Sequence, residues 1–214
     1  MSAESIQLIV NGLLITLALT ATSTIVALIF GTVLGVLRVG SNTVLREAAA
    51  GYIEFFRNIP ILTVLFFMYF GLSRSQVLPI RLSPFSTATW GLGLYTAAYV
   101  AEIIRSGIYA VGRGQIEAAR SLGLSFTQML RLVLLPQAFS VAIPPLGTLL
   151  IALLKNTSIA STIVVGELFY QAGIVEGRTF NPNIFLIIGM IYVAVNIPLG
   201  LLVNYTERRL RILR

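Results

Sequence analysis

The sequence predicts an all-α integral membrane protein, a helical bundle of about five transmembrane helices. Hydrophobic residues make up 57% of the 214 residues and charged residues only 11%. The mean hydropathy is +0.90, and the apolar residues form long runs without charge. A soluble core of this size needs no such excess, so the composition indicates the membrane class. No boundary divides the chain, and residues 1–214 are expected to form one domain.

The first crossing is predicted from Ser5 to Leu37, a run without a charged residue. Its length exceeds the roughly 20 residues that a helix needs to cross the hydrocarbon core, so we expect it to tilt. Gly31 and Gly35 form a small-xxx-small pair that suits close contact with another helix. The second crossing is predicted to begin near Ala48 and to bend at Pro60, because proline removes a backbone donor.

Ser73 to Ser86 is interpreted as an exposed loop, and the third crossing is predicted within Phe85 to Ala110. Glu102 lies toward the inner end of this crossing. A carboxylate near the membrane is a functional candidate, yet Arg105 one turn away offers a structural partner at i,i+3. The interpretation favours the structural pair and keeps Glu102 as a candidate for a substrate path.

The fourth apolar segment, Ala138 to Leu154, is interrupted by Pro144 and Pro145. The polar stretch that follows it consists of Lys155, Asn156, Thr157 and Ser158. In one interpretation it ends the fourth helix, with Lys155 reaching the interface. In the other, it is unwound and faces an aqueous cavity between subunits. The amide and hydroxyl groups of this stretch would then hydrogen-bond the polar groups of a substrate, and the ammonium of Lys155 would bind a carboxylate.

Glu167, Glu176 and Arg178 are interpreted as marking a loop before the last crossing, Ile184 to about Val203. Orientation follows from basic residues. The segment 38–57, the segment 105–131 and the C-terminal tail carry three, four and four of them, eleven in all on one face, against Arg74, Arg81 and Arg178 on the other. The positive-inside rule makes the first face cytoplasmic, so the N-terminus is predicted outside and the C-terminus inside.

Gly114 to Pro136 is a modestly polar island within the candidate coupling region, residues 113–136. It is predicted to form a short helix, a left-handed turn at Gly123, and a second helix that begins at a capping box from Ser125 to Gln128 and ends before Pro136. The small residues Ala118 and Ala119 would let another protein approach closely, with Glu117 as a fixed charge. An ordinary amphipathic loop on the membrane fits the same residues.

Several chemistries are excluded by missing residues. The chain has no His, Cys or Asp and one lysine, Lys155, which follows Leu154. It therefore lacks the residues for an imidazole base, a thiolate, an ordinary zinc site or a phosphate loop ending in Gly-Lys-Ser/Thr. We expect no enzyme activity in this chain. Energy must come from a partner or from an ion gradient, and nothing suggests a nucleic-acid partner.

Glu117-Ala118-Ala119, Gly123 and the run Val133 to Pro136 resemble the EAA signature of ABC importer permeases, with Val133 where isoleucine is usual. Tyr52 to Pro60, Ala98 to Gly107 and Leu154 to Ser158 resemble the polar amino acid uptake branch of that family. The resemblance extends over almost the whole chain.

The resemblance implies a permease subunit of an ATP-driven importer for polar amino acids in a bacterial cell membrane, working by alternating access. Its partners would be cytoplasmic ATPase subunits that hold ATP and Mg, a second permease chain, an extracytoplasmic binding protein and membrane lipid. The coupling residues implied are Glu117, Ala118, Ala119, Arg120, Gly123 and Pro136. The alternative is a self-sufficient channel or an ion-coupled secondary carrier, for which Glu102 is the candidate carboxylate.

Overall fold

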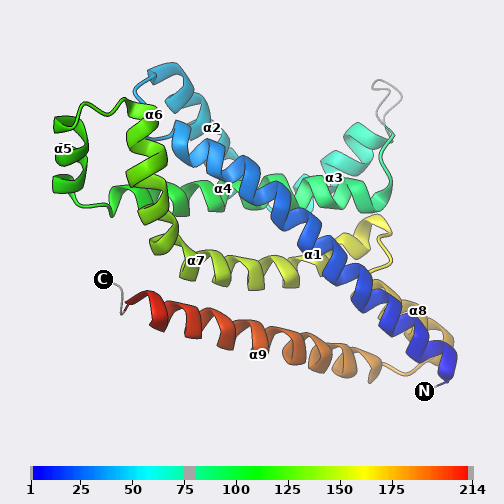
Figure 1. Ribbon diagram of the computed structural model, residues 1–214. Helices are drawn as coiled ribbons and strands as arrows, with labels where there is room; N and C mark the ends of the chain where they lie inside the picture. The colour runs from blue at the N-terminus through cyan, green and yellow to red at the C-terminus, as the bar shows by residue number, and fades with distance from the viewer. Residues whose placement is uncertain (1, 75–80, 212–214) are drawn as a thin grey trace.

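The computed structural model describes residues 2–74 and 81–211, which form helices joined by short connections (Figure 1). Residues 75–80, within the predicted loop from Ser73 to Ser86, lie outside the described residues. The elements are α1 (Ala3–Leu37), α2 (Thr43–Asn58), α3 (Ile61–Phe66), the π-helix η1 (Phe67–Ser73), α4 (Pro84–Tyr109), α5 (Arg113–Ser121), α6 (Phe126–Met129), the π-helix η2 (Leu130–Leu134), α7 (Leu135–Asn156), the 3₁₀-helix η3 (Thr157–Ile163), α8 (Leu168–Thr179) and α9 (Ile184–Arg211).

The predicted close contact at Gly31 and Gly35 is confirmed where α1 packs on α4. A Cβ on Gly31 would lie 2.5 Å from Cβ of Val100, and one on Gly35 would lie 2.8 Å from the carbonyl oxygen of Ala101. Real Cβ atoms do not approach other atoms so closely, so these two positions allow the backbones of α1 and α4 to meet.

The predicted bend at Pro60 is present and is sharper than a kink, because α2 and the α3–η1 segment meet at 106°. Ile59, the residue before the proline, has an extended backbone with φ −105° and ψ 139°. Proline disfavours the helical conformation in its predecessor, so one helix ends at Asn58 and the next begins at Ile61. The sequence interpretation gave one bent crossing where the structure has two helices.

Helix α4 lies at the centre of the fold and packs against α1, α2, α3 and α7. Its buried face is rich in small residues and includes Ala97, Ala98 and Ala101, all with an exposed fraction of 0%. Small side chains bring several helix backbones close to one axis, which suits packing where lipid supplies little hydrophobic driving force.

The prediction that the second helix of the island ends before Pro136 is wrong. The chain stays helical from α6 through η2 into α7, and Phe126–Ile163 is one candidate membrane span. Pro136 occupies the first turn of α7. The π-helical turn of η2 immediately before it changes the backbone bonding pattern where proline has no N–H to donate.

The predicted loop around Glu167 is also corrected, because Glu176 and Arg178 lie within α8 and Glu167 caps its N-terminus. The side chain of Glu167 accepts hydrogen bonds from the backbone N–H groups of Phe169 and Tyr170. Glutamate is an uncommon capping residue, so composition alone favoured a loop here.

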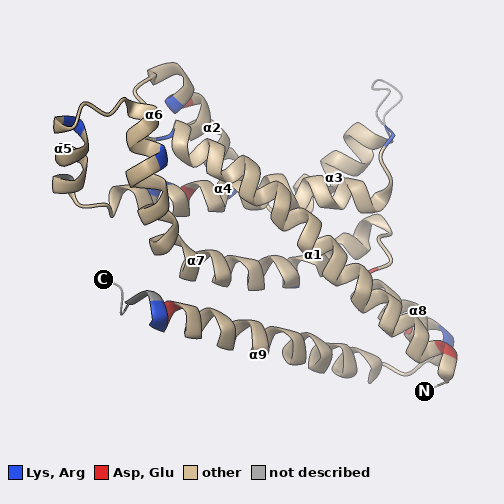
Figure 2. Ribbon diagram, viewed as in Figure 1, with Lys and Arg blue, Asp and Glu red and all other residues tan. Residues whose placement is uncertain are grey.

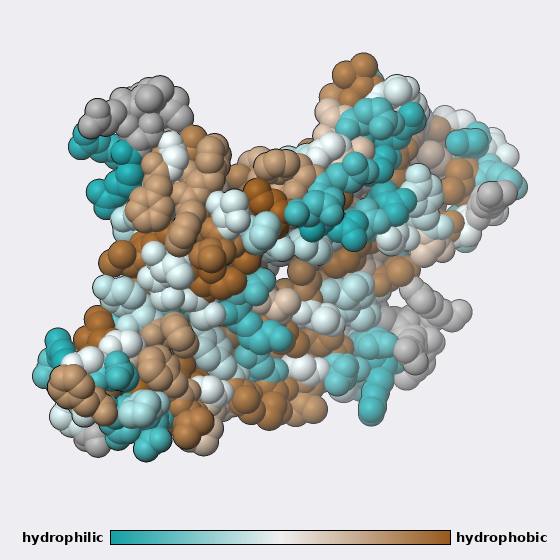
Figure 3. Space-filling model, turned by 180° about the vertical axis from the view of Figure 1, so that it is seen from behind, coloured by the Kyte–Doolittle hydropathy of each residue, from teal (hydrophilic) through white to brown (hydrophobic). Residues whose placement is uncertain are grey.

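Three described helical segments are long and apolar enough to cross a membrane, namely Ala3–Leu37, Phe126–Ile163 and Ile184–Arg209, and a fourth follows if the bent α2–η1 pair is one span. Counting α4 as a fifth crossing stays a prediction, as does the orientation. Figure 3 shows one face of the molecule, on which hydrophobic residues are interspersed with hydrophilic groups, some of them near its middle.

Candidate functional site

The island folds into a helical hairpin built from α5, a glycine turn and α6. Gly123 has φ +73°, and Leu124 N–H donates to the carbonyl of Ala119 while Gly123 N–H donates to that of Arg120. These two bonds are the Schellman pattern that ends a helix at a left-handed residue. The capping box is present, since Ser125 and Gln128 each accept a backbone hydrogen bond from the other. The predicted turn and cap are therefore confirmed.

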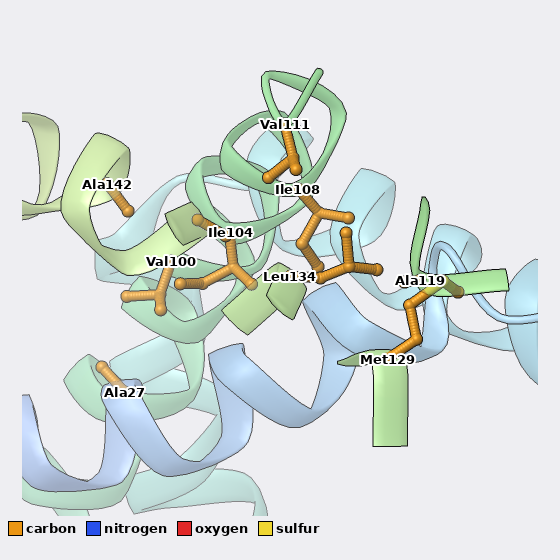
Figure 4. Packing of buried hydrophobic residues seen from close by; sticks show 10 residues of the cluster. Ala27, Val100, Ile104, Ile108, Val111, Ala119, Met129, Leu134 and Ala142 are labelled. Atoms are coloured by element: carbon orange, nitrogen blue, oxygen red, sulfur yellow. The ribbon is translucent and has the colours of Figure 1, made fainter. Parts of the chain in front are cut away.

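The two alanines of the hairpin face different surroundings. Ala118 is exposed, whereas Ala119 is 3% exposed and packs in a cluster with Met129, Leu134 and Ile108. Figure 4 shows the Ala119 and Met129 side chains side by side, with Leu134 against Ile108. Ala119 therefore fixes the hairpin to the protein's own core. The sequence interpretation treated both alanines as surface for a partner.

The exposed surface of the hairpin includes Glu117, Ala118, Arg120 and Leu122. Leu122 has an exposed fraction of 79%, because it is the C-cap residue, where the chain departs from the helix. The hairpin thus presents an apolar side chain beside charged ones, which is the mixed character of a protein-docking surface.

A cavity of about 310 Å³ lies between α2, α4 and α7. This volume is within the range of small-molecule sites. Its lining combines apolar and polar groups: Arg57, Tyr99, Glu102, Ile103, Pro145, Thr148, Leu149 and Ala152. The guanidinium of Arg57 lies 5.9 Å from the centre of the Tyr99 ring, within cation–π range.

Glu102 is both paired with Arg105 and part of the cavity lining, the two roles considered from the sequence. Its carboxylate accepts hydrogen bonds from Nε and Nη2 of Arg105, and it also lines the cavity. An ion-coupled carrier needs a carboxylate that exchanges its ion, and the Arg105 guanidinium occupies this one. The geometry therefore gives the secondary-carrier alternative no support.

The stretch from Lys155 to Ser158 is helical, at the junction of α7 and η3, and so it is not unwound. Thr157 is fully buried, and its hydroxyl donates to the carbonyl of Leu154 at 2.6 Å. The hydroxyl of Ser158 donates to the carbonyl of Lys155. The cavity lining on α7 reaches Ala152 and includes none of these four residues. The structure brings Glu102 to the cavity and leaves the 155–158 stretch apart from it.

The family model described as "Binding-protein-dependent transport system inner membrane component" matches residues 23–212. The chain belongs to this family. The match includes the hairpin and the cavity, and the inner-membrane description agrees with the apolar spans of the structure. The protein is therefore a multi-pass membrane protein.

Curated relatives are similar over nearly their whole length. The chain is 36% identical over 208 residues to the probable glutamine ABC transporter permease protein GlnM of Bacillus subtilis, covering 97% of this chain and 95% of that protein. It is 41% identical over 209 residues to the glutamate transport system permease protein GluC of Corynebacterium glutamicum, covering 92% of each. These relatives are amino acid permeases by name.

A solved structure described as an amino acid ABC transporter with histidines matches with a TM-score of 0.85 and 32% identity. The match covers 96% of this chain and 95% of that one. The arrangement of helices in Figure 1 is thus the fold of the family's transmembrane subunits.

Sequence reasoning missed Arg57 and Tyr99 as cavity residues and Glu167 as a buried group. Arg57 reaches the cavity because α2 packs on α4, a contact between segments far apart in the sequence. Glu167 has an exposed fraction of 0%. A local signal existed, since Glu167 follows Gly166 at the end of an apolar run and precedes a stretch of helix-forming residues.

Proposed function

We propose that this chain is the transmembrane permease subunit of an ATP-driven importer for polar amino acids. The observation that carries the proposal is similarity along nearly the whole chain to amino acid permeases. The chain itself has no phosphate loop, so ATP and Mg²⁺ belong on separate ATPase subunits. An extracytoplasmic binding protein delivers the amino acid, and a second permease chain completes the transporter.

The proposed orientation places the hairpin and the C-terminus in the cytoplasm and the N-terminus outside. Figure 2 supports it, because the basic residues of α2, α5, the α6–η2 segment and the end of α9 lie toward the same end of the molecule. Fewer basic residues lie toward the end that carries α8 and the N-terminus. The positive-inside rule assigns the first end to the cytoplasm.

The proposed docking site for the ATPase is the coupling region 113–136. Glu117, Ala118, Arg120 and Leu122 form its exposed surface, and Gly123 sets its turn. Ala119 and Pro136 act from behind this surface, by anchoring the hairpin and by joining it to α7. A movement of the hairpin therefore passes directly into a membrane-spanning helix.

The proposed substrate path includes the cavity between α2, α4 and α7. A free amino acid carries a carboxylate, and the cavity offers the guanidinium of Arg57. A charge-assisted hydrogen bond to Arg57 would orient the substrate. Glu102 remains a proposed residue of the path as part of the cavity wall, where its carboxylate is paired with Arg105. Lys155, Asn156, Thr157 and Ser158 are retained as proposed residues of the path.

Reconstitution tests this function. The chain is co-expressed with an ATPase subunit and a binding protein from the same organism, purified as a complex, and placed in liposomes with radiolabelled glutamine or glutamate. We expect uptake that requires ATP on the hairpin side and the binding protein on the other. Liposomes with this chain alone are the control. Gradient-driven flux in that control, without any ATPase, would reject the proposal in favour of a self-sufficient carrier.

A further inference from the structure

A buried polar junction joins α1, α8 and α9 at the end of the molecule that carries the N-terminus. We call it the Glu167 junction and define it as Thr16, Glu167, Leu168 and Tyr192. The hydroxyl of Tyr192 donates to the Glu167 carboxylate at 3.2 Å. The backbone N–H of Leu168 donates to the hydroxyl of Thr16 at 3.1 Å. Figure 1 shows the start of α1, α8 and the start of α9 together at this end.

Capping α8 does not by itself require a glutamate. Four other helices of this chain are capped by smaller neutral side chains, those of Ser2, Asn42, Ser83 and Ser125. Glu167 is fully buried, and its carboxylate accepts from two backbone N–H groups and the Tyr192 hydroxyl, which are neutral donors. Burying a carboxyl group among neutral donors costs free energy that a serine cap avoids.

The longer side chain does what a serine cannot, because it reaches α9. One carboxylate oxygen accepts from both Phe169 N–H and the Tyr192 hydroxyl, so the cap of α8 and the bond to α9 share one atom. Apolar packing surrounds the junction, with Ile9 of α1, Leu168 of α8 and Ile188 of α9 in one buried cluster. The three helices therefore meet in one packed unit with a polar bond at its centre.

Helix α9 packs mainly on α7 and α8. Along its middle it exposes apolar side chains, such as those of Met190, Val193 and Ile197. Its second close contact lies toward the opposite end, where Val203 meets Gly147 of α7 so closely that a Cβ on Gly147 would lie 2.4 Å from it. Helix α9 is thus held at two separated points.

We propose that Glu167 is a positioning residue for transport, which holds α9 to α1 and α8 so that these three helices move as one body when the transporter changes conformation. The proposal rests on the proposed function. Without the bond to Tyr192, the hairpin end of α9 would still follow α7 through Val203, while its other end would slip relative to α8. ATP hydrolysis would then continue with less transport for each ATP.

The test uses Tyr192→Phe, which removes only the hydroxyl, in the complete transporter with its ATPase and binding protein in liposomes. The measurement is the number of ATP molecules hydrolysed for each amino acid taken up. We expect this ratio to rise roughly fivefold, the factor that one intramolecular hydrogen bond is worth. Tyr205→Phe is the matched control on the same helix, since its hydroxyl contacts Arg209 at the surface. It should leave the ratio unchanged.

A double-variant cycle separates positioning from general stability. Glu167→Ser, which keeps a capping hydroxyl for α8 but cannot reach Tyr192, should raise the ratio, and Tyr192→Phe added to it should raise it no further. An unchanged ratio in Tyr192→Phe, or uptake and hydrolysis falling together with the melting temperature, would overturn the positioning role and leave the transport function standing. Absence of ATP-driven uptake in the unmodified complex would overturn both.

Discussion

Gly31 of α1 lies directly against Val100 of α4, with no room between them for a methyl group. The contact joins the longest helix of the structure to the central one. Helix α4 also packs against α2 and α7, which line the cavity with it, so this contact helps to position the cavity.

Replacing Gly31 by alanine is expected to destabilise the protein. The new methyl would lie 2.5 Å from Val100 Cβ and push α1 from α4, at a cost of about 1–3 kcal/mol for overpacking. Gly51 is the control, because a Cβ there meets nothing within 4 Å. Gly51→Ala should be neutral or stabilising by about 0.5–1 kcal/mol. Melting of the detergent-solubilised protein measures both, and equal melting temperatures would contradict the packing argument.

Glu117→Lys is expected to abolish coupled uptake and binding-protein-stimulated ATP hydrolysis while the protein still inserts in the membrane. Glu117 is exposed, so the reversal of charge alters the docking surface and leaves the core intact. Glu54→Lys adds the same charge to an exposed position of α2 and should retain activity. Full retention of both activities in Glu117→Lys would remove the hairpin from the coupling pathway.

Arg57→Gln is expected to raise the KM for uptake by about tenfold or more, because the substrate carboxylate would lose a charge-assisted hydrogen bond. The ATPase should still bind and hydrolyse ATP at its basal rate. Initial rates of uptake at varied substrate concentration measure the change, and an unaltered KM would take Arg57 out of the path.

Asn156→Leu tests the polar stretch separately. If Lys155 to Ser158 line the path, this variant raises the KM as Arg57→Gln does. If the path is confined to the cavity, the KM stays at the value of the unmodified protein, because the cavity lining ends at Ala152 on α7. Uptake kinetics of the two variants, measured side by side, decide between the two positions.

Stability is expected to depend on pH through Glu167, which lies between two membrane spans. Burial raises the pKa of Glu167 from 4.5 to about 7, against the opposing effect of its hydrogen bonds. The folded protein therefore holds this proton more tightly than the unfolded chain does. The free energy of unfolding should be highest below pH 4.5 and should fall as the pH rises to about 7.

Glu167→Gln removes this ionisation and with it that part of the pH dependence. The difference in melting temperature between the variant and the unmodified protein should therefore change between pH 4.5 and about 7. The change should be roughly 2–4 °C for each 1 kcal/mol of unfolding free energy. The titratable side chain in contact with Glu167 is Tyr192. The same measurement on Tyr192→Phe shows how much of the pH dependence comes from this contact. A difference that stays constant with pH would show that Glu167 does not titrate there.

Local signals in the sequence predicted the parts of the site that depend on a few neighbouring residues. Ser125 and Gln128 specify a capping box whatever surrounds them, and Gly123 permits a left-handed turn that other residues resist. The pair Gly31 and Gly35 indicated a close helix contact in the same way. These features were confirmed because their causes lie within one or two turns of helix.

The features that could not be predicted depend on distant parts of the chain. Ala119 is buried because Met129 and Leu134, which follow the glycine turn, pack against it. Glu167 is buried because Tyr192, 25 residues later, supplies a hydrogen bond. Helix continuity at Pro136 depends on a π-helical turn, for which no simple sequence signal exists.

The π-helical turn η2 also determines the direction in which the hairpin faces. It holds an extra residue compared with an α-helical turn, so everything before it is rotated by about 100° around the helix axis relative to α7. Deleting one residue from Leu130–Leu134 would leave a continuous helix of nearly the same length, yet it would turn the hairpin toward a different neighbour. The number of residues in η2, and not only their identity, therefore sets the angle between the proposed docking surface of the hairpin and α7.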